Sequence, residues 1–338
     1  MLRNYYADRL ESKELDAYYM LDSAVRSLRP DCRLYGLDQP QAHRVLTAYA
    51  AENPDVWNFC VQFVRMQIDS QGILCRLSYY EGNEALFVQK KEELLTRIKA
   101  SITTQSTDYE VAKKVYDLLA KTVSADMQTQ NAYLQNPPQS EQEIHEYLEQ
   151  HGNAFTAYGA IVEKKAVCMG ISAAYKLLLD ELRVECACVS GQEYGQNHQM
   201  NVVEIDGVRA YVDVTKGVIR EQMPMVFYDA FMMPASHIEQ TFTPDEDFGC
   251  TGDRWSYFSQ SKCKFKDLYS LRRYLNALTY SSTKGEIRFQ YTGTLSDDEI
   301  GKMMSEILSI RCARDYEIAG YIVDRGIGNC YLRKYRGT

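Results

Sequence analysis

The sequence lacks any long hydrophobic run, and this absence excludes a membrane-spanning helix. None of its apolar stretches approaches the roughly 20 residues that a helix needs to cross a bilayer. The start of the chain, MLRNYYADRL, also has no hydrophobic stretch of the kind found in signal peptides. We therefore predict a cytoplasmic protein with no membrane span. A secreted protein whose signal peptide had been removed would show the same pattern.

The ten cysteines show no regular spacing, so the sequence does not indicate a disulfide framework. A chain of 338 residues can bury a sizeable core and needs no disulfides to hold it. Cys186 and Cys188 form a Cys-x-Cys pair, but no second pair is spaced to complete a zinc site. We expect both side chains to pack in a core, and we expect neither a metal nor an organic cofactor.

The charge pattern gives little support to nucleic-acid binding. The formal net charge is −8, although residues 251–338 carry 15 Lys and Arg against 10 Asp and Glu. This basic region has a net charge of +5, but its positive residues are dispersed and no nucleic-acid-binding motif accompanies them. We expect an ordinary solvated surface and no nucleic-acid partner.

Histidine is scarce, with five residues in the chain. We expect His43, His145 and His151 to lie on the surface and His237 to be structural. His198 differs from them because it begins a predicted strand, and it is the candidate for chemistry.

Length and composition are those of a globular protein of two or three domains, with 45% hydrophobic and 25% charged residues. We predict an α+β protein with an N-terminal accessory region at 1–105, a catalytic domain at 106–250 and a small C-terminal α/β domain at 251–338. The predicted elements of the first region are helices at 12–28, 39–51 and 83–102 and a hairpin of strands 57–68 and 73–80.

The later regions also contain clear signals for where helices begin and where loops occur. Thr107 and Asp108 form a helix cap, and Asn136-Pro137-Pro138 indicates a loop over 125–140. A short helix follows at 140–151. For the C-terminal region we predict a half-ferredoxin-like module. Its elements are helix 267–278, strand 286–292, helix 296–310 and strands 316–323 and 330–335.

Cys168 opens the best-specified helix in the chain. Apolar residues recur at helical spacing after it, so one face of that helix is buried: Ile171, Ala174, Tyr175, Leu178, Leu179 and Leu182. The first turn of a helix has unpaired N–H groups and the positive end of the dipole, both of which favour a thiolate. The same N–H groups can stabilise a negative charge on a substrate carbonyl oxygen. Met169 and Gly170 complete this turn, and Gly170 removes side-chain bulk beside the sulfur.

Three strands follow the cysteine helix. The first runs from Glu185 to Val189 and is predicted to break at Ser190-Gly191. Strands 198–205 and 208–215 are joined by Asp206-Gly207, a strong hairpin signal. His198 and Asp213 can then face each other across the paired strands. A thiol, an imidazole and a carboxylate in this arrangement are the nucleophile, the base and the group that orients the base.

These motifs, in this order, resemble those of bacterial transglutaminase-like domains, which belong to a papain-related superfamily of cysteine enzymes. Such domains carry Ala-Tyr-Gly, Val-Cys-x-Gly, a leucine-rich helix, His-x-x-Asn, Asp-Gly and Val-Asp-x-Thr. The strong match covers roughly residues 107–250. The matching motifs here are 157–159, 167–170, 198–201, 206–207 and 212–215.

The resemblance implies a papain-like transglutaminase core and a catalytic triad of Cys168, His198 and Asp213. It also implies supporting roles near the oxyanion or cleft for Tyr158, Met169, Gly170 and Asn201. The reaction would be acyl transfer from a peptide or protein amide through a thioester. The alternatives are a cysteine peptidase or amidase that uses water as the acceptor, and a peptide-binding module without activity.

The chain departs from the family pattern at several aromatic positions. Family members usually have a tryptophan two residues after the histidine, an aromatic pair before the aspartate, a tryptophan after the threonine and an aromatic after the Cys-x-Gly glycine. The resemblance implies that these aromatics line the cleft or pack beside the imidazole. The residues at these positions are Met200, Arg209, Ala210, Lys216 and Ile171.

Overall fold

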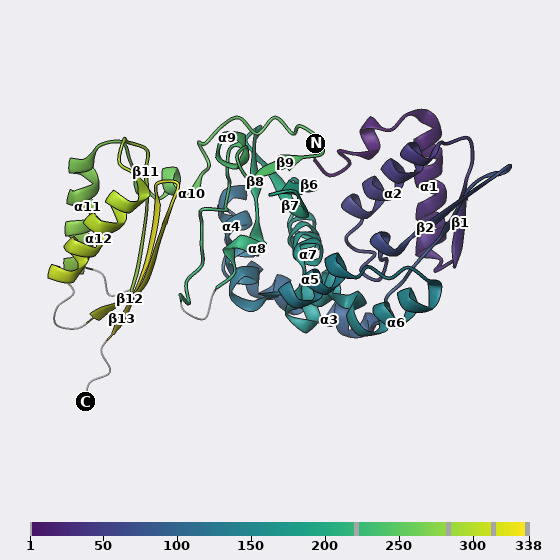
Figure 1. The fold of residues 1–338 in the computed structure, drawn as a ribbon, viewed down its shortest axis with the longest axis horizontal. Helices are drawn as coiled ribbons and strands as arrows, with labels where there is room; N and C mark the ends of the chain where they lie inside the picture. Colours follow the sequence, from purple (N-terminus) through teal and green to yellow (C-terminus); the bar gives the residue numbers. More distant parts are fainter. Residues whose placement is uncertain (1, 220–222, 282–284, 312–315, 335–338) are drawn as a thin grey trace.

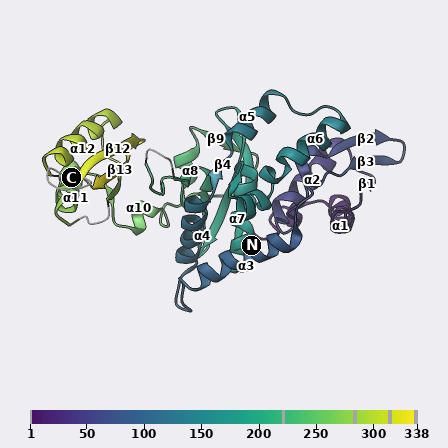
Figure 2. The same ribbon diagram turned by 90° about the horizontal axis from the view of Figure 1, so that it is seen from below.

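The computed structural model describes residues 2–219, 223–281, 285–311 and 316–334, with mixed helix and strand throughout. The elements form three groups along the long axis of the molecule, with the earliest part of the chain at one end and the latest at the other (Figure 1). The view from below shows the same order, with the last group set apart at its end (Figure 2). Within the described residues, no helix combines the length and the apolar character needed to cross a membrane.

The first group packs two helices against a small sheet. Helices α1 (Ser12–Arg26) and α2 (Gln39–Glu52) lie on an antiparallel sheet of order β1-β3-β2. The predicted helices and hairpin are confirmed, but the hairpin strands are short and an additional strand, β1, pairs with β3. The segment 57–64 forms loop and the 3-10 turn η2 instead of strand. The remaining elements are η1 (Ala7–Arg9), β1 (Asp31–Leu34), η2 (Val61–Phe63), β2 (Arg65–Asp69) and β3 (Gly72–Arg76).

Helix α2 begins where the sequence provides a cap. The Asp38 carboxylate accepts a hydrogen bond from Gln41 N, and the Gln41 side chain accepts one from Asp38 N, which forms a capping box. Pro40 stands in the first turn, where its missing N–H costs nothing. These signals place the start of α2 at Gln39. Because helical spacing is counted from that start, they also influence which residues of α2 face the middle group.

The middle group begins with a run of helices. The prediction of a loop over 125–140 is wrong for its first half, because α5 (Met127–Gln135) occupies it. The Asp126 carboxylate caps that helix by accepting hydrogen bonds from both Thr129 N and Thr129 Oγ1. The other elements here are α3 (Glu84–Lys99), α4 (Asp108–Thr122), β4 (Ser124–Ala125), α6 (Glu141–His151), η3 (Gly152–Phe155), η4 (Gly159–Glu163) and β5 (Lys165–Ala166).

Helix α7 (Cys168–Glu181) packs on an antiparallel sheet of order β8-β7-β6-β9, and α4 packs on α7 in turn. The predicted break at Ser190-Gly191 is wrong, since β6 continues through it. A side chain at residue 191 would approach Thr243 O to 2.4 Å, so Gly191 allows β9 to pair closely there. The strands are β6 (Cys186–Glu193), β7 (Gln196–Ile205), β8 (Val208–Val212) and β9 (Phe242–Pro244), and two short helices are α8 (Val214–Gly217) and α9 (Ala235–Ile238).

The last group has the predicted order of strand, helix, strand and strand, and it adds a first strand. The sheet order is β10-β11-β13-β12, with α11 and α12 together on one face (Figure 1). On the sheet itself, Ile322 and Tyr331 pack against Met223, Met225 and Phe227. Tyr335, the end of the last predicted strand, lies outside the described residues. The elements are α10 (Tyr257–Gln260), β10 (Lys264–Phe265), α11 (Leu268–Ser281), β11 (Glu286–Tyr291), α12 (Asp297–Arg311), β12 (Tyr316–Asp324) and β13 (Ile327–Lys334).

Candidate active site

Cys168 is the first residue of α7, as its sequence context predicts. The preceding residue, Val167, has no side-chain oxygen that could cap the first turn. The first backbone hydrogen bond of the helix runs from Ile171 N to Val167 O, so the N–H groups of Cys168, Met169 and Gly170 precede it. The sulfur therefore stands at an uncapped helix start, where a negative charge is stabilised.

Ser172 ties the start of this helix to strand β7. Its hydroxyl lies 2.8 Å from Cys168 O and 3.0 Å from Gln199 O, the residue next to His198. One hydroxyl proton serves one acceptor at a time, and both acceptors hold the buried Ser172 side chain between the helix and the strand. Ser172 thus sets the spacing between nucleophile and base. The sequence analysis did not identify it, because a serine inside a helix carries no signal of its own.

His198 and Asp213 meet at the open end of the β7–β8 hairpin. Asn201 pairs with Val212, so His198 lies three residues before that pair and Asp213 one residue beyond it. The sequence analysis placed Asp213 on a strand, but β8 ends one residue earlier. Asp213 instead caps α8 by accepting a hydrogen bond from Lys216 N. The distance from His198 Nε2 to Asp213 Oδ2 is 2.8 Å.

Electrostatics hold this pair in its charged form. Burial lowers the pKa of His198, but the Asp213 carboxylate and hydrogen bonds to Asp213 and Cys168 outweigh burial and raise that pKa to about 11. Burial also raises the pKa of Asp213, yet attraction to His198 and Lys216 holds it below its usual range. Since Asp213 occupies Nε2, Nδ1 is the ring nitrogen left for the Cys168 thiol. The imidazole therefore bridges the carboxylate and the sulfur.

A second carboxylate and an ammonium group complete the surroundings of His198. Glu193 Oε2 lies 3.9 Å from His198 Nε2, and Lys216 Nζ pairs with Glu193 Oε1 and lies 3.8 Å from Asp213 Oδ2. Glu193, His198 and Asp213 offer ligand atoms within 4.8 Å of one another. The Lys216 ammonium and the His198 imidazolium together balance the two carboxylates, which makes this set a poor cation site. Glu193 was missed by sequence analysis because only the β6–β7 pairing brings it here.

The four expected supporting residues have different surroundings. Met169 lines the cavity in front of Cys168. A side chain on Gly170 would approach the carbonyl oxygens of Ala154 and Thr156 to 2.6 Å, so this glycine admits neighbouring backbone.

The other two supporting residues lie in packed interior. Tyr158 stacks among Trp57, Tyr80 and Phe87, and its hydroxyl accepts a hydrogen bond from Asn83 N at 3.4 Å. Asn201 is fully buried and donates to Ser172 O at 3.1 Å. Neither residue is among those that line the cavity.

The positions that depart from the family aromatics lie in several different surroundings, and Lys216 lies beside the Glu193 and Asp213 carboxylates. Met200 packs in a cluster with Leu2 and Tyr5, while Ile171 and Ala210 belong to the main core between α7 and the sheet. Arg209 pairs with Glu204 at 2.7 Å. None of these positions is among the residues that line the cavity.

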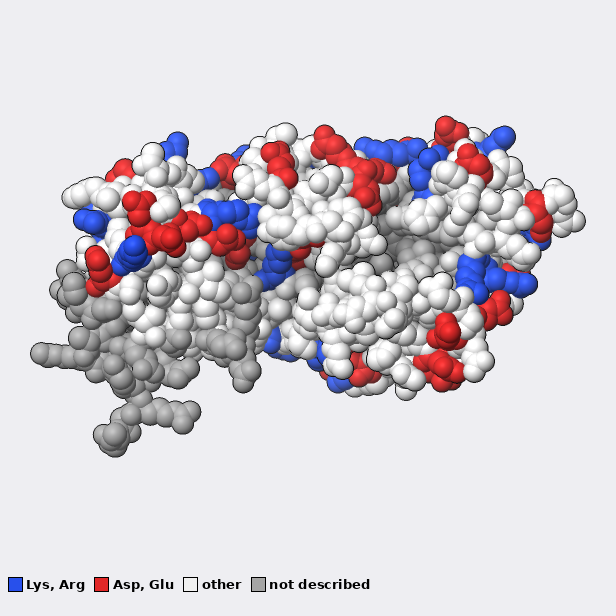
Figure 3. Space-filling model, viewed as in Figure 1, with Lys and Arg blue, Asp and Glu red and all other residues white. Residues whose placement is uncertain are grey.

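The thiol and the imidazole open onto one cavity of about 640 Å³. Its walls come from the middle group and from α2 with the loop that follows it, and the molecule is visibly hollowed between these two groups (Figure 3). A volume of this size is typical of a substrate pocket. Aromatic side chains line it from several elements: Tyr6, Trp57, Phe59, Tyr133 and Phe155.

Solved structures offer weak similarity to known proteins. A protein described as a TGase aligns with 53% of this chain at 15% identity and a TM-score of 0.32, and the match spans 48% of its own length. A candidate cysteine protease from Cytophaga hutchinsonii aligns with 46% of this chain and 62% of its own at 12% identity and a TM-score of 0.27. A candidate protease from Parabacteroides distasonis aligns with 44% of this chain and 30% of its own at 11% identity and a TM-score of 0.25.

This chain thus matches about half the length of the first of these structures. No protein-family model matches the chain, and no curated protein is significantly similar to it. TM-scores this low do not establish a shared fold, so function has to be inferred from the side chains at the site.

Proposed function

We propose that this protein is a cysteine-dependent acyltransferase or hydrolase that acts on peptide or protein amides through Cys168, His198 and Asp213. The observation that carries the proposal is the 2.8 Å contact between His198 Nε2 and Asp213 Oδ2, with Cys168 and His198 lining the same cavity. The proposal includes a papain-like transglutaminase core at 106–250, an accessory region at 1–105 and a C-terminal domain at 251–338. The last helix of the accessory region, α3, packs in the core of the middle group.

In the proposed reaction, the Cys168 thiolate attacks the amide carbonyl carbon, and a C–S bond forms. The tetrahedral intermediate collapses when the C–N bond breaks, and the His198 imidazolium gives its proton to the departing nitrogen. A thioester and a neutral amine or ammonia result. Asp213 holds Nε2, which keeps Nδ1 directed at the sulfur and stabilises the imidazolium.

The uncapped start of α7 supports this chemistry. Cys168 is in the first turn, whose backbone N–H groups have no partner within the helix. They can donate to the carbonyl oxygen of a substrate as it becomes negative during attack by the sulfur. Removal of one such donor typically costs about 100-fold to 1,000-fold in kcat. The absence of a side-chain cap leaves these donors for the substrate.

The acceptor in the second step distinguishes two versions of the proposal. An amine gives transamidation, and water gives deamidation or peptide hydrolysis. The Lys216 ammonium beside the catalytic pair is paired with Glu193, so in either version the acceptor has to come from solution. Ammonia release without incorporation of a labelled primary amine would identify the hydrolase, and incorporation would identify the transferase.

The decisive test is the pH dependence of Cys168 alkylation by iodoacetamide, followed by peptide mass spectrometry. Because the pKa of His198 is raised to about 11, the imidazolium persists through neutral pH. We expect rapid labelling of Cys168 already at pH 6, much faster than in His198→Ala at the same pH. In His198→Ala, labelling should be slow at pH 6 and should rise only near pH 8.5, as for an ordinary thiol.

Cys188 provides an internal control in the same protein, since burial raises its pKa to about 12. It should stay unlabelled throughout this range. A Cys168 profile that rises only near pH 8.5 and is unchanged by His198→Ala would contradict the proposal. The chain would then be better described as a peptide-binding module without activity.

A further inference from the structure

The cavity beside Cys168 is built by two separate parts of the chain. One wall comes from the middle group and holds Cys168, Met169 and His198. The opposite wall comes from α2 and the loop to η2. We define the N-terminal wall as the seven residues Thr47, Ala48, Ala50, Ala51, Val56, Trp57 and Phe59. The same segment also lines the cavity with His43, Arg44, Asn53, Pro54, Val61 and Gln62.

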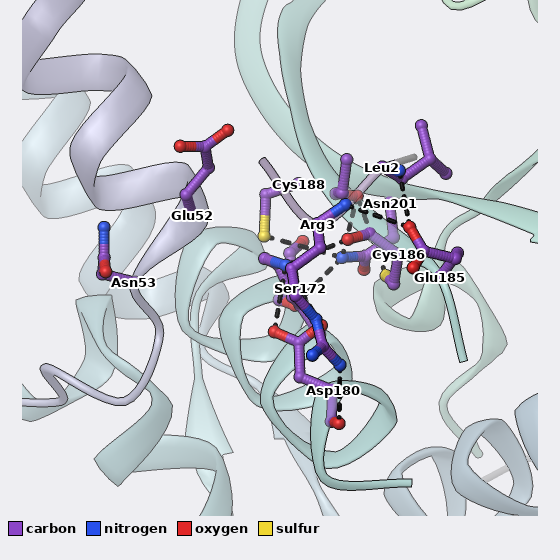
Figure 4. A network of polar contacts seen from close by, with 12 residues as sticks. Leu2, Arg3, Glu52, Asn53, Ser172, Asp180, Glu185, Cys186, Cys188 and Asn201 are labelled. Atoms are coloured by element: carbon purple, nitrogen blue, oxygen red, sulfur yellow. Dashed lines mark hydrogen bonds and ion pairs between the residues drawn. The ribbon is translucent and has the colours of Figure 1, made fainter. Parts of the chain in front are cut away.

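The first residues of the chain fasten the N-terminal wall in place. Leu2 N donates to Glu185 Oε2 at 2.6 Å, and Arg3 Nη2 donates to Asp180 O at 3.0 Å, as the close-up shows (Figure 4). Tyr6 then connects the two walls directly. Its N–H donates to Glu52 Oε1 at the end of α2 at 2.6 Å, and its hydroxyl donates to Cys188 O on β6 at 2.8 Å.

A second set of contacts fixes the other end of the wall. Trp57 stacks against Tyr158 of the middle group with ring centroids 5.1 Å apart. Phe63 packs against Phe155 at 5.5 Å, in a cluster that also contains Val167, the residue before the nucleophile. Anchored at both ends, the wall is pre-formed and does not depend on closure around a ligand.

The chemistry of the N-terminal wall is apolar. Its helical part presents small residues, which leave space, and its loop part presents aromatic and β-branched residues. The charged residues that line the cavity are of both signs: Arg9, Arg44, Asp245 and Glu246, with His43 beside them. Arg44 is paired with the buried Glu14, so its charge is already compensated. A charged substrate group would lose hydration against the seven residues of the N-terminal wall, and none of those seven carries an ionisable side chain that could pair with it.

We propose that this cavity takes an apolar, uncharged segment of the acyl donor, and that the N-terminal wall is the specificity-determining surface of the enzyme. This inference rests on the proposed function, since it takes Cys168 as the reacting atom. The segment lies against α2 and Trp57 while its carbonyl carbon is presented to the sulfur. Burial of an apolar side chain there contributes roughly 1.5–3 kcal/mol of transfer free energy, so a side chain of phenylalanine size should raise kcat/KM by at least tenfold.

The test uses four alkylating agents with the same reactive group: iodoacetamide and the iodoacetyl derivatives of phenylalanine amide, glutamate amide and lysine amide. Each alkylation rate at Cys168 is divided by the rate with N-acetylcysteine, which removes intrinsic reactivity. We expect the phenylalanine agent to react at least about tenfold faster than iodoacetamide on this scale. Both charged agents should be slower than iodoacetamide. Equal relative rates for all four would overturn the inference, as would a preference for either charged agent.

Two variants locate the preference on the N-terminal wall. Ala50→Phe fills the cavity from α2, and Ala85→Phe makes the same change on the exposed face of α3, away from the cavity. Ala50→Phe should remove the preference for the phenylalanine agent, measured as the ratio of its rate to the iodoacetamide rate in the same variant, and Ala85→Phe should leave that ratio unchanged. Thr47→Leu is a smaller change on the same wall and serves as a second variant in case Ala50→Phe does not fold. Comparison of its thermal unfolding with that of the wild type shows whether the fold is kept.

The outcomes separate this inference from the proposed function. Rapid, His198-dependent iodoacetamide labelling without selectivity would leave the proposed function standing and would overturn the inference. Labelling that does not depend on His198 would contradict the proposed function itself. A preference that survives both Ala50→Phe and Thr47→Leu would show that the apolar segment binds elsewhere.

Discussion

Helix α7 carries two clusters in which a lysine, a carboxylate and a cysteine come together, and they differ in almost everything else. At its start, Cys168 and His198 adjoin Asp213, Glu193 and Lys216 and open onto the cavity. Two turns later, Lys176 is fully buried, with its ammonium 3.0 Å from both Asp180 Oδ2 and Cys186 O. The residue types are nearly the same, but only the first cluster contains an imidazole and access to a substrate.

The comparison teaches that residue type does not determine whether a buried charged cluster does chemistry. Burial lowers the pKa of Lys176, but the Asp180 carboxylate outweighs it and keeps that pKa above its ordinary value. Burial raises the pKa of the Cys186 thiol well above its ordinary value, so this thiol stays protonated and unreactive. The second cluster is therefore structural. The first cluster keeps a charged imidazole next to a sulfur and a space for substrate.

The largest difference between the clusters should appear when each cysteine is removed. Cys168→Ala should abolish acyl transfer or hydrolysis, with a loss of at least about 1,000-fold in kcat, because no thioester can form. Cys186→Ala should keep kcat within about twofold while lowering the free energy of unfolding through the cavity it leaves. Ammonia release from a peptide amide and urea unfolding measure the two effects. Equal losses of activity would contradict the distinction between the clusters.

Replacing the lysine of each cluster should reverse this order: the variant at the buried second cluster should lose more free energy of unfolding than the variant at the first. Lys176→Met removes the buried partner of the Cys186 carbonyl and leaves Asp180 only the Arg3 guanidinium at 4.0 Å, and we expect the free energy of unfolding to fall by about 3 kcal/mol. Lys216→Met serves as the matched control, since its side chain is 31% exposed and both of its carboxylate partners keep the His198 side chain beside them. Urea unfolding of both variants tests this ranking. A smaller effect for Lys176→Met than for Lys216→Met would show that the interior pair is dispensable.

The stability contributed by the His198–Asp213 pair should depend on pH in a defined window. Because the folded-state pKa of His198 is raised from 6.5 to about 11, its contribution is complete below pH 6.5 and disappears as the pH rises toward 11. The pKa of Asp213 is lowered, so its contribution is present above about pH 4 and is lost on acidification.

Asp213→Asn removes this linkage while it keeps a similar side-chain shape. Its free energy of unfolding should fall below that of wild type by about 2 kcal/mol between pH 4.5 and 6.5, and by progressively less toward pH 10. Denaturant unfolding at four pH values measures the difference. A difference that is constant with pH would mean that the pair is not charged in the folded protein.

The smallest effect should come from the ammonium beside the catalytic pair. In Lys216→Met, the Glu193 and Asp213 carboxylates both face His198 without a compensating charge, which raises the pKa of the imidazole further and slows proton delivery to the leaving group. We expect kcat to fall by about tenfold. Adding Glu193→Gln to this variant should restore most of the loss, and failure of this restoration would exclude the electrostatic explanation.

Much of this organisation could be predicted from local sequence. Capping boxes and apolar periodicity located most helices to within a few residues, and Asp206-Gly207 located the β7–β8 hairpin. The errors occurred where local signals were overruled. Asn136-Pro137-Pro138 suggested a longer loop than exists, because the Asp126 cap starts a helix before it. Gly191 suggested a strand break, but it permits the close approach of β9.

The sequence by itself determined that a cysteine opens an amphipathic helix and that a histidine and an aspartate flank a hairpin, because caps, turns and periodicity depend on neighbouring residues. Only the tertiary structure decided what surrounds them. The pairing of Glu193 with Lys216, the bridge through Ser172 and the apolar wall from α2 join residues far apart in the chain. Such contacts depend on how the helix packs on the sheet and on how the first residues fasten α2 to it, and local sequence patterns do not encode that packing.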